Sequence, residues 1–488
     1  MSGEKGLTAH AARGGAITIA AQLVKIAVMV LSIVVLARLI SPSDYGIFAM
    51  VIAIVGVAEI FRDFGLSMAA LQAKTLSQQQ QSNLFWLNLA IGVTLTILVF
   101  GSSWLIAAFY GVPEIVAIAQ VLCLSFALNG ASTQFKVVIN RRLEFFKLSL
   151  IDVAPYAVGF LFAAWLAWSG WGVWALVWQQ VIVAITTLLF ATILARWIPS
   201  TPKRTSMDGL VGFGWRIAVT QIIGYFTRNI DSIAIGRAWG STQLGFYDRA
   251  YQVVMMPINQ INAPLSRVAV PTISRVRSEP ERFAGALRQA QLVTLYGTAS
   301  VFGLLAASGD IVVRIVLGET WVAAGPLVQV LAIGAVFRAL SQMCYWIYIA
   351  KGLASEQLKF YLIAQPALAA VILIGLPWGA AGVSISYAAG LIVYWLVSLV
   401  WACRKAGTSP RLLLIDAARA LLVFTFPAAL ACFAVTRLLP IENDLGRLMS
   451  GVAAALVWWA VSALLFKTIR SDLRKLIGFV RSALQRRK

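Results

Sequence analysis

The chain has 488 residues, of which 60% are hydrophobic and 12% charged, and its formal net charge is +21. Soluble domains carry about twice that share of charged residues, so this composition excludes a soluble globular domain and indicates a polytopic membrane protein. In a soluble chain such an excess of Lys and Arg would suggest nucleic-acid binding. Here most basic residues fall between long apolar runs, and we expect no nucleic-acid partner.

Fourteen apolar runs are long enough to cross a bilayer as helices, which takes about 20 residues each. The runs lie at 15–37, 46–71, 84–108, 115–139, 149–168, 172–195, 213–236, 246–270, 288–308, 325–350, 358–376, 380–402, 416–437 and 447–466. The predicted fold is therefore all-α, with two six-helix lobes followed by two additional transmembrane helices.

The same pattern predicts the domain boundaries. We expect an N-terminal six-helix lobe at 1–198, a cytoplasmic linker at 199–212 and a C-terminal six-helix lobe at 213–405. The two additional helices occupy 406–467. The tail at 468–488 spaces its apolar residues as a helix does and is rich in Lys and Arg, which predicts a basic amphipathic helix on the anionic lipids of the inner leaflet.

A stretch of about fifty residues occurs twice, 199 positions apart and without a gap. The aligned identities include Gly15 with Gly214, Gln22 with Gln221, Arg38 with Arg237, Gly46 with Gly245, Leu66 with Leu265, Ser67 with Ser266, and Ala70 with Ala269. An even number of predicted spans separates the copies, so both begin at the same membrane face. The repeat is therefore parallel, and transporters use such repeats to form two lobes around a central path.

The distribution of basic residues predicts the orientation. With a cytoplasmic N-terminus, the inner segments hold 28 Lys and Arg and the outer loops hold 5, which is a strong positive-inside bias. Both termini are then cytoplasmic. No small-residue cleavage site follows the first apolar run, so we expect it to be a retained anchor.

Several chemistries lack the residues they need. The single histidine, His10, precedes the first span, which excludes any mechanism that needs a histidine inside the membrane. No G-x-x-x-x-G-K-[ST] motif is present for binding nucleotide phosphates, and the four cysteines are scattered without a C-x-x-C pair. We therefore predict no catalytic residues, no metal site, no cofactor and no enzymatic activity.

Basic residues inside the predicted spans are the candidates for contact with a substrate. A charge at the bilayer centre costs roughly 2.5 to 3.5 kcal/mol even on the mild insertion scale, so each needs a physical reason to be there. The deepest lie about eight or more residues from either end of their spans. The substrate-binding candidates are Lys25, Arg62, Arg228 and Arg338. Guanidinium and ammonium groups in a hydrated cavity favour an anionic passenger.

Carboxylates lie close to two of these cations in the sequence. Glu59 and Asp63 flank Arg62, and Asp231 follows Arg228 by three positions, which places the pair on one helix face. Glu59, Asp63 and Asp231 are therefore candidates for proton or sodium coupling. The alternative is that these pairs only neutralise one another within the helix bundle.

Two prolines interrupt the span at 246–270. Proline removes a backbone donor and kinks a helix, and membrane helix bundles tolerate and use such bends. Pro257 and Pro264 are the predicted hinge residues.

Several motifs resemble one known family. They are A-R-L-I-S-P-S-D-Y-G-I-F at 37–48, F-G-L at 64–66, N-R-R-L-E-F at 140–145 and L-G-F-Y-D-R-A-Y at 244–251. Together they make the chain similar to Wzx-type flippases for polysaccharide and lipid-linked oligosaccharide, within the multidrug/oligosaccharidyl-lipid/polysaccharide superfamily. The branch that exports colanic-acid-like and teichuronic-acid-like polysaccharides is the most similar.

The resemblance implies a MATE-like fold with a cationic central cavity that opens alternately to the two sides. It implies a transporter in the bacterial cytoplasmic (inner) membrane that translocates undecaprenyl-pyrophosphate-linked oligosaccharide for exopolysaccharide or lipopolysaccharide biosynthesis. The expected partners are this lipid-linked oligosaccharide and membrane lipids, with contact to polymerase or export machinery left open. The alternatives are an ion-coupled drug antiporter of the same superfamily, a membrane glycan polymerase, and a scaffold that transports nothing.

Overall fold

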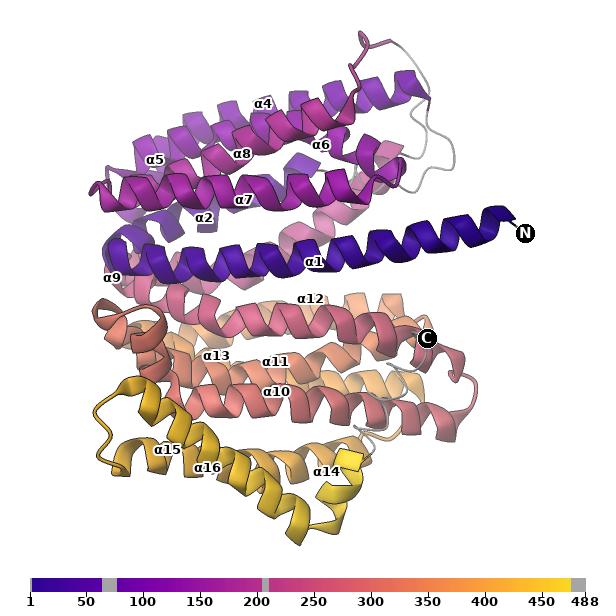
Figure 1. Cartoon of the computed structure of the whole chain (residues 1–488), viewed down its shortest axis with the longest axis vertical. Coiled ribbons are helices and arrows are strands. Elements are labelled where there is room, and N and C mark those ends of the chain that lie inside the picture. The colour runs from indigo at the N-terminus through magenta and orange to yellow at the C-terminus, as the bar shows by residue number, and fades with distance from the viewer. Residues whose placement is uncertain (1, 64–76, 204–209, 475–488) are drawn as a thin grey trace. The chain divides into compact units, whose positions relative to one another are not determined.

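The computed structural model describes residues 2–63, 77–203 and 210–474. Every regular element in these residues is helical, which confirms the predicted all-α fold (Figure 1). The chain divides into two compact units, Met1–Gly245 and Phe246–Lys488. The predicted lobe boundaries at 199–212 stay a prediction.

The first unit is a bundle of apolar helices. It contains α1 (Ser2–Leu39), α2 (Pro42–Asp63), α4 (Gln78–Tyr110), α5 (Ile115–Leu122), α6 (Leu124–Arg141), α7 (Phe145–Trp168), α8 (Val173–Ala195) and the first part of α9 (Leu210–Arg275). The helix α7 packs against α1 and α8, and α6 packs against α4 and α8. A cluster that includes Phe85, Phe135 and Ile151 fills the space between α4, α6 and α7.

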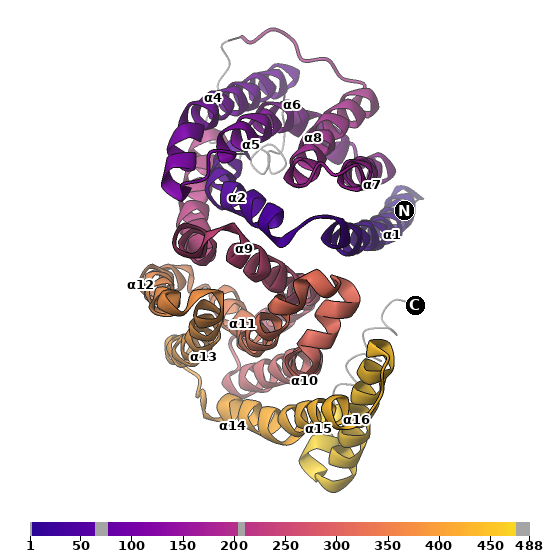
Figure 2. The same ribbon diagram turned by 90° about the vertical axis from the view of Figure 1, so that its left-hand side faces the viewer.

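The second unit begins within α9 and adds the remaining helices. They are α10 (Pro280–Val316), η1 (Glu319–Ala324), α11 (Gly325–Lys351), α12 (Ala354–Ile374), η2 (Leu376–Trp378), α13 (Gly379–Ala406), α14 (Arg411–Arg419), η3 (Ala420–Thr425), α15 (Phe426–Leu438) and α16 (Asp444–Leu465). The helix α11 packs against α10 and α13, while α12 packs mainly on α13. The segment α14–α16 packs on α10, and Figure 2 shows both arrangements nearly end-on.

Eleven stretches of the described residues are long and apolar enough to cross a membrane. One of them, Ala354–Ala406, contains two of the fourteen predicted spans, as α12 and α13. The two predicted spans at 213–236 and 246–270 both lie in α9. The protein is thus a multi-pass membrane protein, and a described helix overlaps each predicted span.

The long helix α9 is interrupted at Gly240. Its backbone there has φ 80° and ψ −177°, a conformation that glycine adopts without the steric cost other residues would have. The repeat aligns Gly240 with Ser41, which lies in the break between α1 and α2. The two parts of α9 therefore correspond to α1 and α2 of the first copy.

The start of α2 and the corresponding start of the second part of α9 contact each other through repeated glycines. A Cβ added to Gly46 would overlap the carbonyl oxygen of Ser241, and a Cβ added to Gly245 would overlap that of Pro42. Ser241 is the repeat equivalent of Pro42, so the two contacts are reciprocal. The Ser43 and Ser241 hydroxyls also hydrogen-bond at 2.8 Å.

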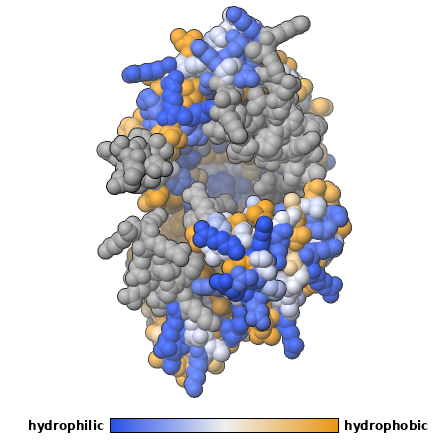
Figure 3. Space-filling view, turned by 90° about the vertical axis from the view of Figure 1, so that its right-hand side faces the viewer, coloured by the Kyte–Doolittle hydropathy of each residue, from blue (hydrophilic) through white to orange (hydrophobic). Residues whose placement is uncertain are grey.

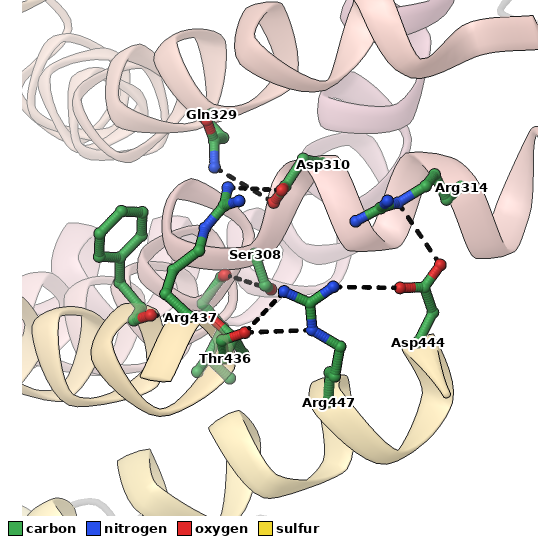
Figure 4. Close-up of polar contacts among 10 residues, drawn as sticks. Ser308, Asp310, Arg314, Gln329, Thr436, Arg437, Asp444 and Arg447 are labelled. Atoms are coloured by element: carbon green, nitrogen blue, oxygen red, sulfur yellow. Dashed lines mark hydrogen bonds and ion pairs between the residues drawn. The ribbon is translucent and has the colours of Figure 1, made fainter. Parts of the chain in front are cut away.

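Ion pairs fasten α15 and α16 to the end of α10 at the predicted outer face. Arg437 pairs with Asp310 at 2.5 Å, and Arg314 pairs with Asp444 at 3.4 Å (Figure 4). The carbonyl oxygen of Thr436 accepts from Nε and Nη2 of Arg447. The predicted outer basic residues Arg314 and Arg437 therefore hold helices together.

A second polar cluster fastens the other end of the same segment. Asp416 pairs with Arg288 of α10 and accepts from Arg419 at 3.0 Å. Arg419 also pairs with Asp472 at 2.5 Å, and Asp472 accepts from the Tyr296 hydroxyl at 3.2 Å. The segment α14–α16 is thus held to α10 near both ends.

The exposed surface separates into apolar flanks and a polar end. Figure 3 looks onto one end of the helices, where hydrophilic residues are abundant among the described atoms. The flanks expose large apolar side chains, including Leu105 at 73% and Leu161 at 65%. This distribution suits helices that lie in hydrocarbon and end in the lipid headgroups.

Candidate functional site

A polar cavity of about 440 Å³ lies within the first unit. It is lined by α1, α2, α5, α6, α7 and α8. Four charged side chains reach it: Lys25, Lys136, Glu59 and Asp152. Ser125, Asn129, Gln180 and Thr187 add uncharged polar groups. Placing such groups against lipid is energetically unfavourable, so a cavity of this composition inside membrane-spanning helices indicates a hydrated compartment.

Each charge in this cavity comes from a different helix. Lys25 lies on α1, Glu59 on α2, Lys136 on α6 and Asp152 on α7. Glu59, Lys136 and Asp152 lie within about two turns of the helix ends that the positive-inside pattern places in the cytoplasm. The cavity therefore occupies the half of the bundle that the predicted orientation places toward the cytoplasm, with Lys25 as the charged residue farthest from those helix ends.

Lys25 faces an aromatic ring. Its Nζ lies 4.3 Å from the ring centroid of Tyr156 on α7, a distance at which an ammonium group is attracted to the ring face. Tyr156 lies one turn after Asp152 on the same helix and also lines the cavity. This contact holds the Lys25 side chain at the wall of the cavity, beside Tyr156.

Arg338 lies in the second unit and is held by two tyrosines. Its Nη1 donates to the hydroxyl of Tyr251 on α9 at 3.1 Å and to the hydroxyl of Tyr387 on α13. The two rings meet edge to face, with centroids 5.9 Å apart. Among the side chains that the structure describes, no carboxylate pairs with Arg338. Its charge is positioned by neutral hydroxyls and can still pair with an anion.

The other predicted site residues divide into two groups. Glu59 lines the cavity, while Asp231 is 2% exposed and its Oδ1 accepts from the Ser232 backbone amide at 2.8 Å. Pro257 lies within the helical second part of α9. The remaining four residues lie outside those whose side chains are described: Arg62, Asp63, Arg228 and Pro264.

Lys136 and Asp152 line the cavity but are not among the site residues predicted from the sequence. Both lie near the predicted inner ends of their spans, and Lys136 was counted among the inner basic residues. The helix α6 extends to Arg141 and α7 begins at Phe145, so both residues lie within helices and reach the cavity. Their spacing could have indicated the cavity. Lys136 follows Asn129 by seven residues and Asp152 precedes Tyr156 by four, so each lies on the same helix face as a polar residue that lines the cavity.

A model of the polysaccharide biosynthesis protein family matches residues 35–326, which is more than half of the chain. The chain belongs to this family. The matched part of this polysaccharide biosynthesis protein contains every charged cavity residue except Lys25, and it spans both copies of the glycine contact. The membership confirms the predicted family resemblance.

One relative supports the predicted branch of the family. The chain is 31% identical over 308 residues to the teichuronic acid biosynthesis protein TuaB of Bacillus subtilis (strain 168). The alignment covers 62% of this chain and 63% of TuaB, so it spans less than two thirds of that relative.

Solved structures of transporters share the fold. The lipid II flippase MurJ in an inward closed conformation matches with a TM-score of 0.71 and 14% identity, covering 91% of this chain and 98% of MurJ. An inward-facing multidrug resistance MATE family transporter of the MOP superfamily matches with a TM-score of 0.57 and 13% identity, covering 78% and 94%. At these identities the likeness concerns the fold, and it confirms the predicted MATE-like architecture.

Proposed function

We propose that this protein translocates undecaprenyl-pyrophosphate-linked oligosaccharide repeat units across the cytoplasmic membrane, and that it does so without catalysing a covalent reaction. The observation that carries the proposal is the charged cavity inside the membrane-spanning helices of a polysaccharide biosynthesis protein. The flippase fold of MurJ and the role in teichuronic acid biosynthesis that TuaB's name states support it.

The physical task is to carry a charged, hydrophilic headgroup through hydrocarbon. Removing such groups from water without compensating contacts is strongly unfavourable. A cavity with polar and charged walls supplies those contacts, while the polyprenyl chain stays in lipid. The lobes then rock so that the cavity opens to the other side, as parallel-repeat transporters do.

The described cations are assigned to the pyrophosphate. Lys25 and Lys136 line the cavity of the first unit, and Arg338 offers a guanidinium in the second. Arg62 and Arg228 keep the same proposed role on the basis of their depth in the sequence. Guanidinium suits phosphate because it can donate two parallel hydrogen bonds.

The acidic residues are assigned to ion coupling. Glu59 and Asp152 share the cavity with Lys25, so a change in their protonation changes the net charge that the headgroup meets. Asp63 and Asp231 keep this role from the sequence analysis. The proposed location is the bacterial inner membrane, with both termini in the cytoplasm and a lipid-linked oligosaccharide as the partner.

Deletion of the protein tests this function. Completed lipid-linked repeat units should accumulate on the cytoplasmic leaflet, as measured by their resistance to a membrane-impermeant glycan label in sealed cells. Arg338→Gln should lower the labelling of repeat units on the outer leaflet at least about tenfold, because a charge-assisted contact contributes roughly 1.5 to 3 kcal/mol. Accumulation of unpolymerised units on the outer surface would contradict the proposal and indicate a polymerase.

A drug or small-molecule antiporter is the second candidate. The observation that favours it is the equal number of carboxylates and amines in the cavity, because carboxylates suit cationic substrates. Deletion would then raise the accumulation of cationic dyes and leave the distribution of lipid-linked repeat units between the leaflets as it is in the parent strain. The same deletion strain therefore separates the two candidates.

A further inference from the structure

An apolar groove of about 310 Å³ lies between α12 and α13 in the second unit, separate from the charged residues described above. Small residues open it, namely Ala364 and Ala367 on α12 and Ala389 on α13. Along α12 it extends from Phe360 to Val371, about 16 Å at the helical rise of 1.5 Å per residue. These dimensions suit an extended hydrocarbon chain.

The rim of the groove is apolar and exposed, which suits contact with lipid. Ile363 is 67% exposed, Val393 59% and Val397 50%, so apolar side chains border the opening. At Gly390 the two helices approach closely, since an added Cβ there would lie 2.7 Å from Leu368 Cδ1. This approach limits the groove at the end away from Phe360. A chain would therefore enter from the hydrocarbon side and lie along the helices.

Aromatic rings form the end of the groove nearest the predicted inner face. Phe360 is 3% exposed, and its ring centroid lies 5.6 Å from Tyr394 and 5.8 Å from Trp401. The Trp401 Nε1 is buried and has no hydrogen-bond acceptor among the described residues. A buried indole N–H usually finds a partner, so this end of the groove offers an unused donor.

Basic side chains lie one turn beyond this donor. Lys405 Nζ lies 5.7 Å from the Trp401 ring centroid and 3.0 Å from Glu356, which also pairs with Lys359 at 2.8 Å. One carboxylate thus serves two ammonium groups, which are 47% and 64% exposed for Lys405 and Lys359. The exposed Arg404 adds a further positive charge.

We propose that this groove binds an anionic phospholipid of the inner leaflet. One acyl chain lies in the groove, an ester carbonyl accepts from Trp401 Nε1, and the phosphate lies beside Lys405 and Lys359. The order of these groups along α13 matches the order in the lipid, since the apolar lining is followed by the indole and then by the ammonium group. The site is independent of the proposed transport function.

Native mass spectrometry of the full chain in detergent tests the site, with phosphatidylglycerol and phosphatidylcholine of the same acyl composition as probes. Phosphatidylglycerol should bind more tightly to the native protein. The double variant Lys359→Ala, Lys405→Ala should weaken its binding about tenfold or more, because each surface Lys contributes about 1 kcal/mol toward anionic lipid. Lys147→Ala, which removes an inner lysine of the first unit, should change nothing.

A second variant tests the groove itself. Ala367→Phe fills the groove and should weaken the binding of both lipids. A diazirine placed on the acyl chain of phosphatidylglycerol should crosslink the lipid to residues of α12 and α13 in the native protein. Equal binding of the two lipids by the native protein would overturn the headgroup assignment. Crosslinks confined to other helices would overturn the site, and this measurement does not require any variant to fold. Neither result depends on transport of an oligosaccharide.

Discussion

The two copies of the repeat agree in their framework and differ in their charges. Gly46 and Gly245 occupy equivalent positions, and each packs against the residue equivalent to the other's partner. Lys25, in contrast, aligns with Gly224, so the deepest charged residue of the cavity has no counterpart in the second copy. Repetition thus preserves the contact between equivalent helices, and function is associated with the positions where the copies differ.

This difference has a physical reason. The reciprocal backbone contacts leave no room for a side chain at Gly46 or at Gly245, so the packing requires glycine at both positions. A cavity residue meets water and substrate on one side, and its replacement leaves the packing of the helices intact. Equivalent helices can therefore acquire different charges without losing their packing.

The largest expected effect comes from breaking the framework. Gly46→Ala and Gly245→Ala each place a methyl group against a backbone carbonyl that cannot rotate away. We expect each to destabilise the protein by about 3 kcal/mol or more, at the upper end of the cost of overpacking. The measurement is the thermal unfolding midpoint of purified protein in detergent, together with its yield from membranes.

Gly101→Ala and Gly285→Ala are the matched controls. Both glycines lie within helices, and an added Cβ has no neighbour within 4 Å. Alanine favours a helix over glycine by about 1 kcal/mol, so these variants should be as stable as the native protein or slightly more stable. A Gly46→Ala variant as stable as these controls would contradict the reciprocal contact.

The next effect concerns the charges. Lys25→Gly gives the first copy the residue of the second, and we expect it to lower outward transport of lipid-linked oligosaccharide about tenfold because one charged contact to the headgroup is lost. The variant should lose only about 1 kcal/mol of stability, the cost of a glycine inside a helix, since Lys25 is partly exposed in the cavity. Transport is measured by labelling repeat units on the outer leaflet.

Two further variants distinguish charge from structure. Lys25→Arg keeps the positive charge and should recover most of the transport, whereas Lys147→Ala removes a basic residue that pairs with Glu144 outside the cavity and should have no effect. If Lys25→Gly transported normally, the assignment of the cavity to the headgroup would fail.

The sequence predicted the helices well because membrane spans are read from length and hydropathy alone. It also aligned Gly46 with Gly245, although nothing in a linear sequence shows that the two glycines lie together. The predicted spans at 213–236 and 246–270 leave a break at 237–245, and Gly240 lies within it; the backbone angles there were not predicted, because an isolated glycine between two apolar runs does not reveal them.

The site was predicted less completely for a related reason. Lys25 and Arg338 were predicted from their depth within a span. The Lys25 side chain reaches the cavity, and the Arg338 side chain reaches the tyrosine pair. The same criterion did not identify Lys136 and Asp152, because charged residues near a predicted helix end are normally expected to lie among the lipid headgroups. Their orientation depends on how α6 and α7 pack, and a single sequence does not contain that information.

The smallest expected effect concerns the hydrogen bond beside the glycine contact. Ser43→Ala or Ser241→Ala removes one hydroxyl of the pair at 2.8 Å, and we expect a loss of about 1 kcal/mol, since the partner hydroxyl is only partly buried and can turn to water. The double variant should cost less than the sum of the single variants, because both changes remove the same bond. Thermal unfolding of all three variants measures this coupling. Strict additivity would mean that the two serines do not interact, and the reciprocal contact would then depend on the glycines alone.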